Sequence, residues 1–271
     1  MSSAAFENAS VFVDDVTVAP ALKAQHLSLS WDDSHVVVAD VNITVSAGET
    51  VCMVGRSGCG KTTILHALAG LTRPLEGQIL LHGKDVTGIP GHVSYMFQKD
   101  LLIPSKRVLD NVCLPLTLKG MSKAAAHKQA RPLLGRFGLA DTEDKWPSEL
   151  SGGMRQRAAF LRTYLMGNDV MLLDEPFSAL DAITRKDLRE WFVLTSRELG
   201  VAALMITHDV DEAVALASRV YVLGGNPSAG KPSHILGEVL VQRESGSSDA
   251  DFELTSAFLE AKRAVLALLN S

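Results

Sequence analysis

The residues Gly55-Arg56-Ser57-Gly58-Cys59-Gly60-Lys61-Thr62 satisfy the pattern G-x-x-x-x-G-K-[ST] in full. The apolar run from Thr50 to Val54 predicts a buried strand before this pattern, and the spacing from Lys61 to Ala69 predicts a helix after it. Glycines in such a turn let backbone amides approach phosphate groups, the Lys61 ammonium can neutralise their charge, and the Thr62 hydroxyl can ligate Mg²⁺. The chain is therefore predicted to contain a phosphate-binding loop. Its candidate ligand-binding residues are Gly55, Arg56, Ser57, Gly58, Cys59, Gly60, Lys61, Thr62 and Thr63.

A second anion site is predicted at Ser151-Gly152-Gly153, within the octet Leu150 to Arg157. Successive backbone N–H groups at the start of a helix attract negative charge. The apolar strand Val170 to Leu173 ends in the acids Asp174 and Glu175, at the edge where open α/β sheets bind their ligands. We expect Asp174 to hold Mg²⁺ through water. Two anion sites and one catalytic carboxylate suggest a nucleotide clamped between two copies of the chain.

The order of strands and helices predicts the fold class. Two segments that alternate apolar and polar residues, His26 to Trp31 and Val41 to Val45, predict antiparallel strands. Helical stretches separate the later strands and predict a parallel sheet covered on both faces. The expected strands are 50–54, 78–81, 93–97, 170–173, 202–206, 220–223 and 234–241, with helices at 182–199 and 209–217. The predicted class is α/β: a P-loop NTPase core with a mainly parallel sheet, an antiparallel β-subdomain and an inserted helical lobe.

Three parts are expected along the chain. They are residues 1–20, a flexible leader; residues 21–241, the nucleotide-binding domain with its helical lobe at about 99–166; and residues 242–271, a linker and a C-terminal amphipathic helix. That last helix is predicted from Phe252 to Leu269. Within the lobe, Ser122 is expected to cap a helix from Lys123 to Phe137, and Pro132 to kink or interrupt it.

The composition limits the possible location and partners. The net charge of -5 argues against a protein that works on nucleic acid. The chain starts without an apolar signal segment and has no run near the roughly 18 apolar residues of a membrane span, so we expect a cytosolic protein that reaches a membrane through a partner. The three cysteines are an odd number without metal-ligand spacing, as in a reducing compartment. Cys52 is expected in the core, whereas Cys59 is expected to carry an accessible thiol close to the nucleotide.

From Ala24 to Gly225, these motifs and their order resemble the ATP-binding cassette (ABC) ATPases that drive membrane transport. The resemblance implies that Glu175 is the base that polarises the attacking water, that Gln98 contacts Mg²⁺ and this water, and that His208 contacts the γ-phosphate. The implied cofactors are ATP and Mg²⁺. The candidate metal ligands are Thr62, Gln98 and Asp174.

The same resemblance assigns two further elements. An aromatic residue in the place of Trp31 stacks on adenine in the family, and a flat indole can do so. The residues Ser178 to Asp181 match the family's dimer-communication loop, although Asp181 is equally well placed to cap the following helix. Both roles can hold together.

Three segments resemble a particular group of importers, those for nitrate, sulfonate, taurine and thiamine precursors: Gln98 to Pro104, Leu161 to Tyr164 and Asp181 to Arg185. The resemblance implies an ATP-sandwich dimer that works with transmembrane permease subunits, and indirectly with a solute-binding protein, at the cytoplasmic face of the membrane. The apolar and basic stretch Lys99 to Val108 is expected to form a groove for a coupling helix of the permease.

The main alternative is a soluble ABC ATPase that acts on nucleic acid or ribosomes. Such proteins insert long coiled-coil arms or carry two cassettes, whereas this chain has one phosphate loop and a negative net charge. Exporters usually fuse membrane helices to the cassette, and an inactive scaffold would not keep Lys61, Asp174, Glu175 and His208. We therefore expect the energising subunit of an importer for a small organic or anionic solute, with no nucleic acid as partner.

Overall fold

The computed structural model describes residues 19–31, 35–243 and 252–271, so nearly all of the predicted leader and linker lies outside the described residues. Ten strands form one sheet in the order β5-β4-β1-β2-β10-β9-β3-β8-β7-β6. The strands are β1 Leu22–Ser30, β2 Val36–Val45, β3 Thr50–Gly55, β4 Glu76–Leu81, β5 Lys84–Asp85, β6 Ser94–Met96, β7 Val170–Asp174, β8 Ala202–Thr207, β9 Arg219–Asn226 and β10 Lys231–Leu240.

The central strands are parallel, as the sequence predicts. β3 pairs in parallel with β8 and β9, β8 with β7, and β7 with β6. Their residues form near-continuous buried runs, as expected for strands covered on both faces. The carboxyl ends of these strands therefore meet at one edge of the sheet. The predicted antiparallel β-subdomain is also present, because β1 pairs antiparallel with β2 and β4.

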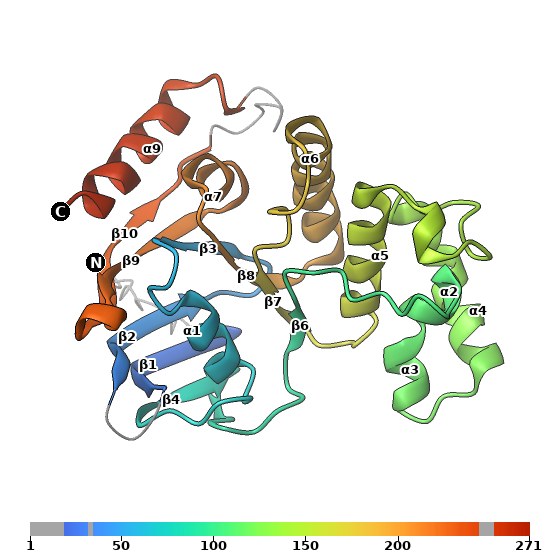
Figure 1. The fold of residues 1–271 in the computed structure, drawn as a ribbon, viewed down its shortest axis with the longest axis horizontal. Coiled ribbons are helices and arrows are strands. Elements are labelled where there is room, and N and C mark those ends of the chain that lie inside the picture. The colour runs from blue at the N-terminus through green and yellow to red at the C-terminus, as the bar shows by residue number, and fades with distance from the viewer. Residues whose placement is uncertain (1–18, 32–34, 244–251) are drawn as a thin grey trace, which may run out of the picture.

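Helices cover the sheet and form a separate group at one end (Figure 1). The helices are α1 Lys61–Leu68, α2 Val108–Val112, α3 Leu114–Leu118, α4 Lys123–Arg136, α5 Gly152–Tyr164, α6 Ala182–Leu199, α7 Val210–Leu216 and α9 Ser256–Leu269, with short 3-10 turns at Pro147–Glu149 and Pro227–Ala229. Helices α2 to α5 are inserted between β6 and β7 and gather at one end of the molecule, and α9 lies toward the opposite end. This insertion is the predicted helical lobe.

Local sequence explains where the functional helices start. The side chains of Ser151, Asp181 and Asp209 each accept a backbone N–H of the first turn, at α5, α6 and α7 respectively. Gly200 ends α6 with φ 63°, a left-handed conformation that glycine adopts without steric cost. The starts of α5, α6 and α7 are therefore each fixed by the side chain of the residue before the helix.

Of the two outcomes predicted for Pro132, interruption of the helix is wrong, and the C-terminal helix starts later than predicted. Helix α4 runs unbroken through Pro132, because the buried Ala126, Ala130 and Leu134 hold its apolar face in the core on both sides of the proline. Helix α9 starts at Ser256 rather than at Phe252, because the Thr255 hydroxyl accepts the N–H of Phe258. None of the helices in the described ranges is long and apolar enough to cross a membrane.

Candidate nucleotide-binding site

A cavity of about 320 Å³ lies at the carboxyl edge of the parallel strands. It is lined by residues from the phosphate-binding loop, from the end of β1, and from the segments that follow β6 and β7. The lining residues are Trp31, Ser57, Gly58, Gly60, Lys61, Thr62, Thr63, Gln98, Asp174 and Glu175. The sheet topology thus brings together side chains that are more than 140 positions apart in the sequence.

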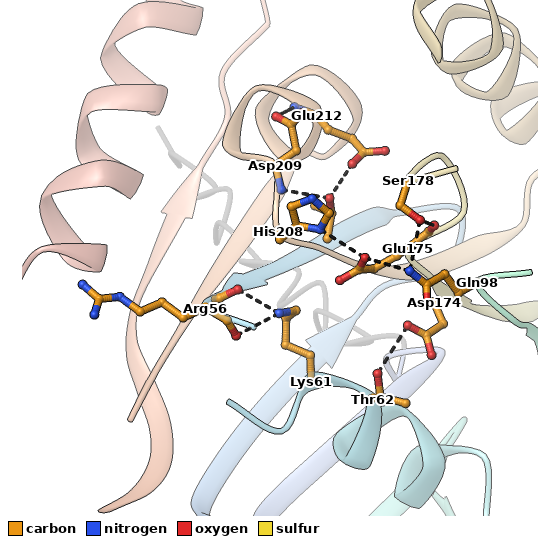
Figure 2. Close-up of polar contacts among 12 residues, drawn as sticks. Arg56, Lys61, Thr62, Gln98, Asp174, Glu175, Ser178, His208, Asp209 and Glu212 are labelled. Carbon is orange, nitrogen blue, oxygen red and sulfur yellow. Dashed lines mark hydrogen bonds and ion pairs between the residues drawn. The ribbon is translucent and has the colours of Figure 1, made fainter. Parts of the chain in front are cut away.

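The phosphate-binding loop is a compact turn between β3 and α1. Lys61 is 5% exposed, and its Nζ donates to the carbonyl oxygens of Gly55 at 2.8 Å and of Arg56 at 3.2 Å (Figure 2). Gly58 and Gly60 have φ values of 79° and 97°, which favour glycine. A Cβ at Gly60 would also lie 2.9 Å from Val37 Cγ1. The left-handed glycines and the two hydrogen bonds to loop carbonyls therefore hold the Lys61 ammonium against the phosphate-binding loop.

Asp174 sits at the end of β7, where three oxygen-bearing side chains meet. The hydroxyl of Thr62 donates to Oδ1 at 3.4 Å, and the hydroxyl of Tyr95 donates to Oδ2 at 3.2 Å. Burial raises the pKa of Asp174 and the adjacent Glu175 charge raises it further, although the hydrogen bond from Tyr95 opposes the rise. A carboxylate held in this way is stabilised by a cation.

The donor set fits Mg²⁺. Thr62 and Asp174, with the nearby amide of Gln98, offer hard oxygen atoms to a cation. The described part of the chain has no cluster of three or more His, Cys, Asp or Glu side chains that could hold a metal alone. Mg²⁺ commonly takes one or two protein oxygens and completes its shell with water and substrate phosphate, as this site would require.

Glu175 is the centre of a polar network (Figure 2). Its Oε2 lies 3.1 Å from His208 Nδ1 and accepts a hydrogen bond of 3.3 Å from Gln98 Nε2. Gln98 also donates to Ser178 Oγ at 3.2 Å. The backbone of Glu175 has φ 43°, a left-handed conformation that costs a non-glycine residue about 1 to 3 kcal/mol. Its N–H donates to Ile206 O at 3.0 Å, which fixes the carboxylate at the sheet edge.

A buried network behind His208 is absent from the sequence predictions. The hydroxyl of Thr207 donates to Glu212 and accepts the N–H of Asp209 at 3.1 Å, and Asp209 Oδ1 accepts the N–H of Glu212 at 3.1 Å. Glu212 is 4% exposed, and its burial raises its pKa. The pattern D-x-x-E from Asp209 to Glu212 is the capping-box signature that could have revealed this arrangement. The network fixes the turn that presents the His208 ring.

Trp31 lies at the rim of the cavity, and 56% of its surface is exposed. Arg56 belongs to the same loop as Lys61, but its side chain points away from the Lys61 ammonium (Figure 2). It lines a separate cavity beside the end of α9. Only the backbone of Arg56 is therefore placed to serve a bound phosphate.

The expectation that the Cys59 thiol is accessible is wrong. Its side chain is 2% exposed and does not line the cavity. The sulfur packs against Gly55, where an added Cβ would lie 2.8 Å from it. Burial raises the pKa of the Cys59 thiol. Cys52 is fully buried, as predicted.

The second predicted anion site does not line this cavity within one chain. Ser151 Oγ accepts the N–H of Met154 at 3.3 Å at the start of α5. A Cβ at Gly152 would lie 3.2 Å from Leu180 Cδ2, and one at Gly153 would lie 2.9 Å from Thr184 Cγ2. These glycines let the start of α5 pack closely against the loop and helix that follow β7.

A second, largely apolar cavity of about 510 Å³ lies between the segment after β6 and the inserted helices. Its lining residues are Leu71, Tyr95, Phe97, Leu101, Leu114, Pro115, Leu118, Lys119, Arg162, Thr163 and Met166. Of the stretch Lys99 to Val108, for which a docking groove is predicted, only Leu101 lines this cavity. Leu102 and Val108 lie in the core.

Comparisons with known proteins agree with this geometry. Residues 38–178, just over half of the 271 residues, match the family described as ABC transporter. The chain is 37% identical over 209 residues to the formylaminopyrimidine import ATP-binding protein of Halalkalibacterium halodurans, which covers 77% of this chain and 82% of the relative. It is 37% identical over 210 residues to the taurine import ATP-binding protein of Pseudomonas aeruginosa, with coverage of 76% and 80%.

Among solved structures, a dimer of the ATP-binding cassette MJ0796 in a post-hydrolysis state with ADP and Pi has a TM-score of 0.68 at 26% identity. The match covers 82% of this chain and 100% of that chain. The residues that match the family, 38–178, include the phosphate-binding loop and the acidic end of β7. The chain belongs to the ABC transporter family.

Proposed function

We propose that the chain is the ATP-binding and ATP-hydrolysing subunit of an ABC importer. The observation that carries this proposal is the placement of Glu175 between Gln98 and His208, at the edge of a cavity lined by the phosphate-binding loop. A carboxylate that is oriented by two neighbours and is adjacent to a phosphate site is suited to general-base catalysis on water. The two import relatives support the same function.

The proposed substrate is ATP, with its phosphates in the loop and its base at the rim. Backbone amides from Gly58 to Thr63 face the phosphates, and the Lys61 ammonium moves from the loop carbonyls to the β- and γ-phosphate oxygens. The indole of Trp31 stacks on adenine. Thr62, Asp174 and the Gln98 amide would hold Mg²⁺, which would supply positive charge to the phosphate oxygens.

Hydrolysis needs one proton acceptor, and Glu175 is placed to supply it. The water oxygen forms a bond to the γ-phosphorus, the bond from that phosphorus to the β,γ-bridging oxygen breaks, and the water proton passes to the Glu175 carboxylate. Gln98 and His208 hold this carboxylate in place, and the His208 ring faces the γ-phosphate. The Thr207–Glu212 network keeps that ring oriented.

We infer that two copies close around two nucleotides. Ser151 to Gly153 form an anion site at the start of α5 that does not reach the nucleotide cavity of their own chain. A second copy supplies a nucleotide for that site. The dimeric cassette that resembles this chain supports the arrangement.

The proposed partners are permease subunits in the membrane and, through them, a solute-binding protein. The largely apolar 510 Å³ cavity lies next to Gln98, because Phe97 and Leu101 line it on either side of that residue. An amphipathic helix from a permease would fill such a groove with its apolar face. We therefore place the chain peripherally at the cytoplasmic face of a membrane, with a small organic or anionic solute as cargo.

Proteoliposomes that contain this chain and a co-expressed permease provide the test. Labelled taurine and formylaminopyrimidine are the first solutes to examine, each with its binding protein. The expected result is uptake that needs ATP and Mg²⁺ and is lost with Lys61→Ala. If phosphate is released without uptake of any solute, the ATPase assignment stands and the import assignment is wrong.

A further inference from the structure

Asp100 lies two residues after Gln98, and its carboxylate contacts both its own segment and helix α5. Its Oδ1 accepts the N–H of Leu102 at 3.0 Å, and its Oδ2 lies 3.3 Å from Arg155 Nε. Arg155 stands on α5, one turn after Ser151. Arg155 Nη1 also donates to Leu150 O at 2.8 Å, directly before the predicted anion site. The guanidinium of Arg155 therefore joins the segment after Gln98 to the start of α5.

A second arginine of α5 fixes the same segment. Arg162 Nη1 donates to Leu101 O at 2.8 Å, and its Nη2 donates to Asp100 O. Leu101 has φ 47°, an unfavourable left-handed conformation for a leucine, and its side chain is 52% exposed in the apolar groove. Two arginines of one helix hold a strained turn in place. Such a turn persists only when its surroundings fix it.

We propose that the Asp100–Arg155 ion pair is a positioning element that couples Gln98 in one nucleotide cavity to the Ser151 anion site of the same chain. This inference rests on the proposed function, in which that anion site serves the nucleotide of the second copy. A γ-phosphate that aligns Gln98 then also sets the direction of α5. Binding at one nucleotide site thereby prepares the surface that closes on the other nucleotide.

The energetics favour a modest effect that is specific to assembly. The side chains of Asp100 and Arg155 are 30% and 38% exposed, so solvent screens the pair only in part. Loss of the pair leaves α5 with more orientations relative to Gln98. Only one of these orientations of α5 fits the closed dimer, so the apparent affinity of the two copies for each other falls. ATP binding to a single chain involves neither residue and should not change.

The test measures ATP-dependent dimerisation in a Glu175→Gln background, which prevents turnover, by sedimentation across a range of Mg-ATP concentrations. Asp100→Asn keeps an oxygen for the Leu102 N–H and removes the charge, and Arg155→Gln removes the partner charge. Each change should raise the half-maximal ATP concentration for dimerisation about fivefold, as expected for a partly buried ion pair. Arg155→Lys, which retains the charge without the fork, should recover part of this loss.

Adding Asp100→Asn to Arg155→Gln should cause no further loss, because both changes remove the same ion pair, while the bond from Arg155 to Leu150 O is lost with the arginine alone. The matched control is Arg131→Gln, which breaks an ion pair of 3.5 Å to Glu143 in the same helical lobe and should leave dimerisation unchanged. Monomer ATP affinity and the thermal midpoint serve as checks of folding.

Three results would overturn the inference. The first is independent, multiplied effects in the double variant, and the second is a shift no larger than that of Arg131→Gln. The third is a parent Glu175→Gln chain that remains monomeric at saturating Mg-ATP. That third result would reject the sandwich itself, whereas the first two reject only the positioning role of the pair.

Discussion

Replacing Glu175 by glutamine should separate ATP binding from ATP hydrolysis. The amide has the shape of the carboxylate, and its oxygen can still accept the 3.3 Å hydrogen bond from Gln98. The amide also removes the negative charge that lies 3.1 Å from His208 Nδ1, but 58% of the histidine side chain is exposed. Screening limits this loss to below about 1 kcal/mol of folding free energy. The fold and the nucleotide affinity should therefore persist.

The catalytic effect should be much larger than the effect on stability. A positioned general base contributes about 10²- to 10⁴-fold to a rate, which corresponds to roughly 2.7 to 5.4 kcal/mol in the activation barrier. An amide cannot take the water proton, so the whole of this contribution is removed. We expect turnover to fall at least 100-fold.

The assay is phosphate release in a single turnover, with ATP affinity and the thermal midpoint measured on the same preparation. Glu190→Gln is the matched control, because Glu190 is a surface carboxylate in an exposed pair with Lys186. It should keep full turnover. Turnover by Glu175→Gln within tenfold of the parent rate, in a folded protein that binds ATP, would refute general-base catalysis by Glu175.

Three other measurements test separate parts of the site. Asp174→Asn should lose Mg²⁺-dependent hydrolysis without lowering the thermal midpoint at pH 7, because burial raises the pKa of Asp174 and makes its charge costly to the fold. The ionised Asp174 destabilises the fold as pH rises through that raised pKa. Any gain in stability of the Asp174→Asn variant over the parent chain should therefore vanish toward pH 3.8, the ordinary pKa of an aspartate. A thermal midpoint of the variant several degrees lower at pH 7 would contradict this reasoning. The native chain should react slowly with iodoacetamide at Cys59, followed by mass spectrometry, and rapid quantitative alkylation would show that the thiol is accessible after all. Leu118→Glu, at a groove residue that is 79% exposed, should weaken co-purification with the permease and leave ATP affinity intact, whereas Leu254→Glu, 84% exposed outside the groove, should do neither. Equal effects of these two leucine changes would remove the groove as the docking site.

Features set by the backbone are those that the sequence predicts best. Gly58 and Gly60 of the phosphate-binding loop adopt left-handed conformations that favour glycine, so their positions in the sequence predict the turn after β3. Parallel strands also end at one edge, and this places Gln98, Asp174 and His208 together whatever their distance in the sequence. The roles given to these side chains follow from the resemblance and stay predictions.

Side-chain direction is harder to predict, because it depends on contacts that a linear pattern does not contain. Cys59 lies within the phosphate-binding loop, yet its side chain points into the protein and its sulfur packs beside Gly55. The stretch after Gln98 contains the consecutive apolar residues Leu101 to Ile103, but Leu102 faces the core and Leu101 faces the groove. No periodicity distinguishes the two, since the left-handed turn at Leu101 breaks the alternation.

Helix continuity is a further case in which tertiary contacts decide the outcome. Pro132 removes one hydrogen bond from α4, and on propensity alone it should kink or end the helix. The apolar residues on both sides of it are buried in one core, so that unfolding the second half would expose them. The free energy gained by burying these apolar residues therefore exceeds the cost of the hydrogen bond lost at Pro132.

The rim position of Trp31 gives the chain an optical property. The chain has three tryptophans, and the other two lie in protein contacts: Trp146 under the Arg107 guanidinium at 3.7 Å, and Trp191 among the rings of Phe137 and Phe160. The indole of Trp31 is the most exposed of the three and should emit at longer wavelength than the other two, which are partly buried, and adenine stacked upon it would quench that emission. A variant in which Trp146 and Trp191 are replaced by phenylalanine would carry one native fluorophore at the mouth of the nucleotide cavity. Arrival and departure of nucleotide could then be followed in real time in an unlabelled transporter.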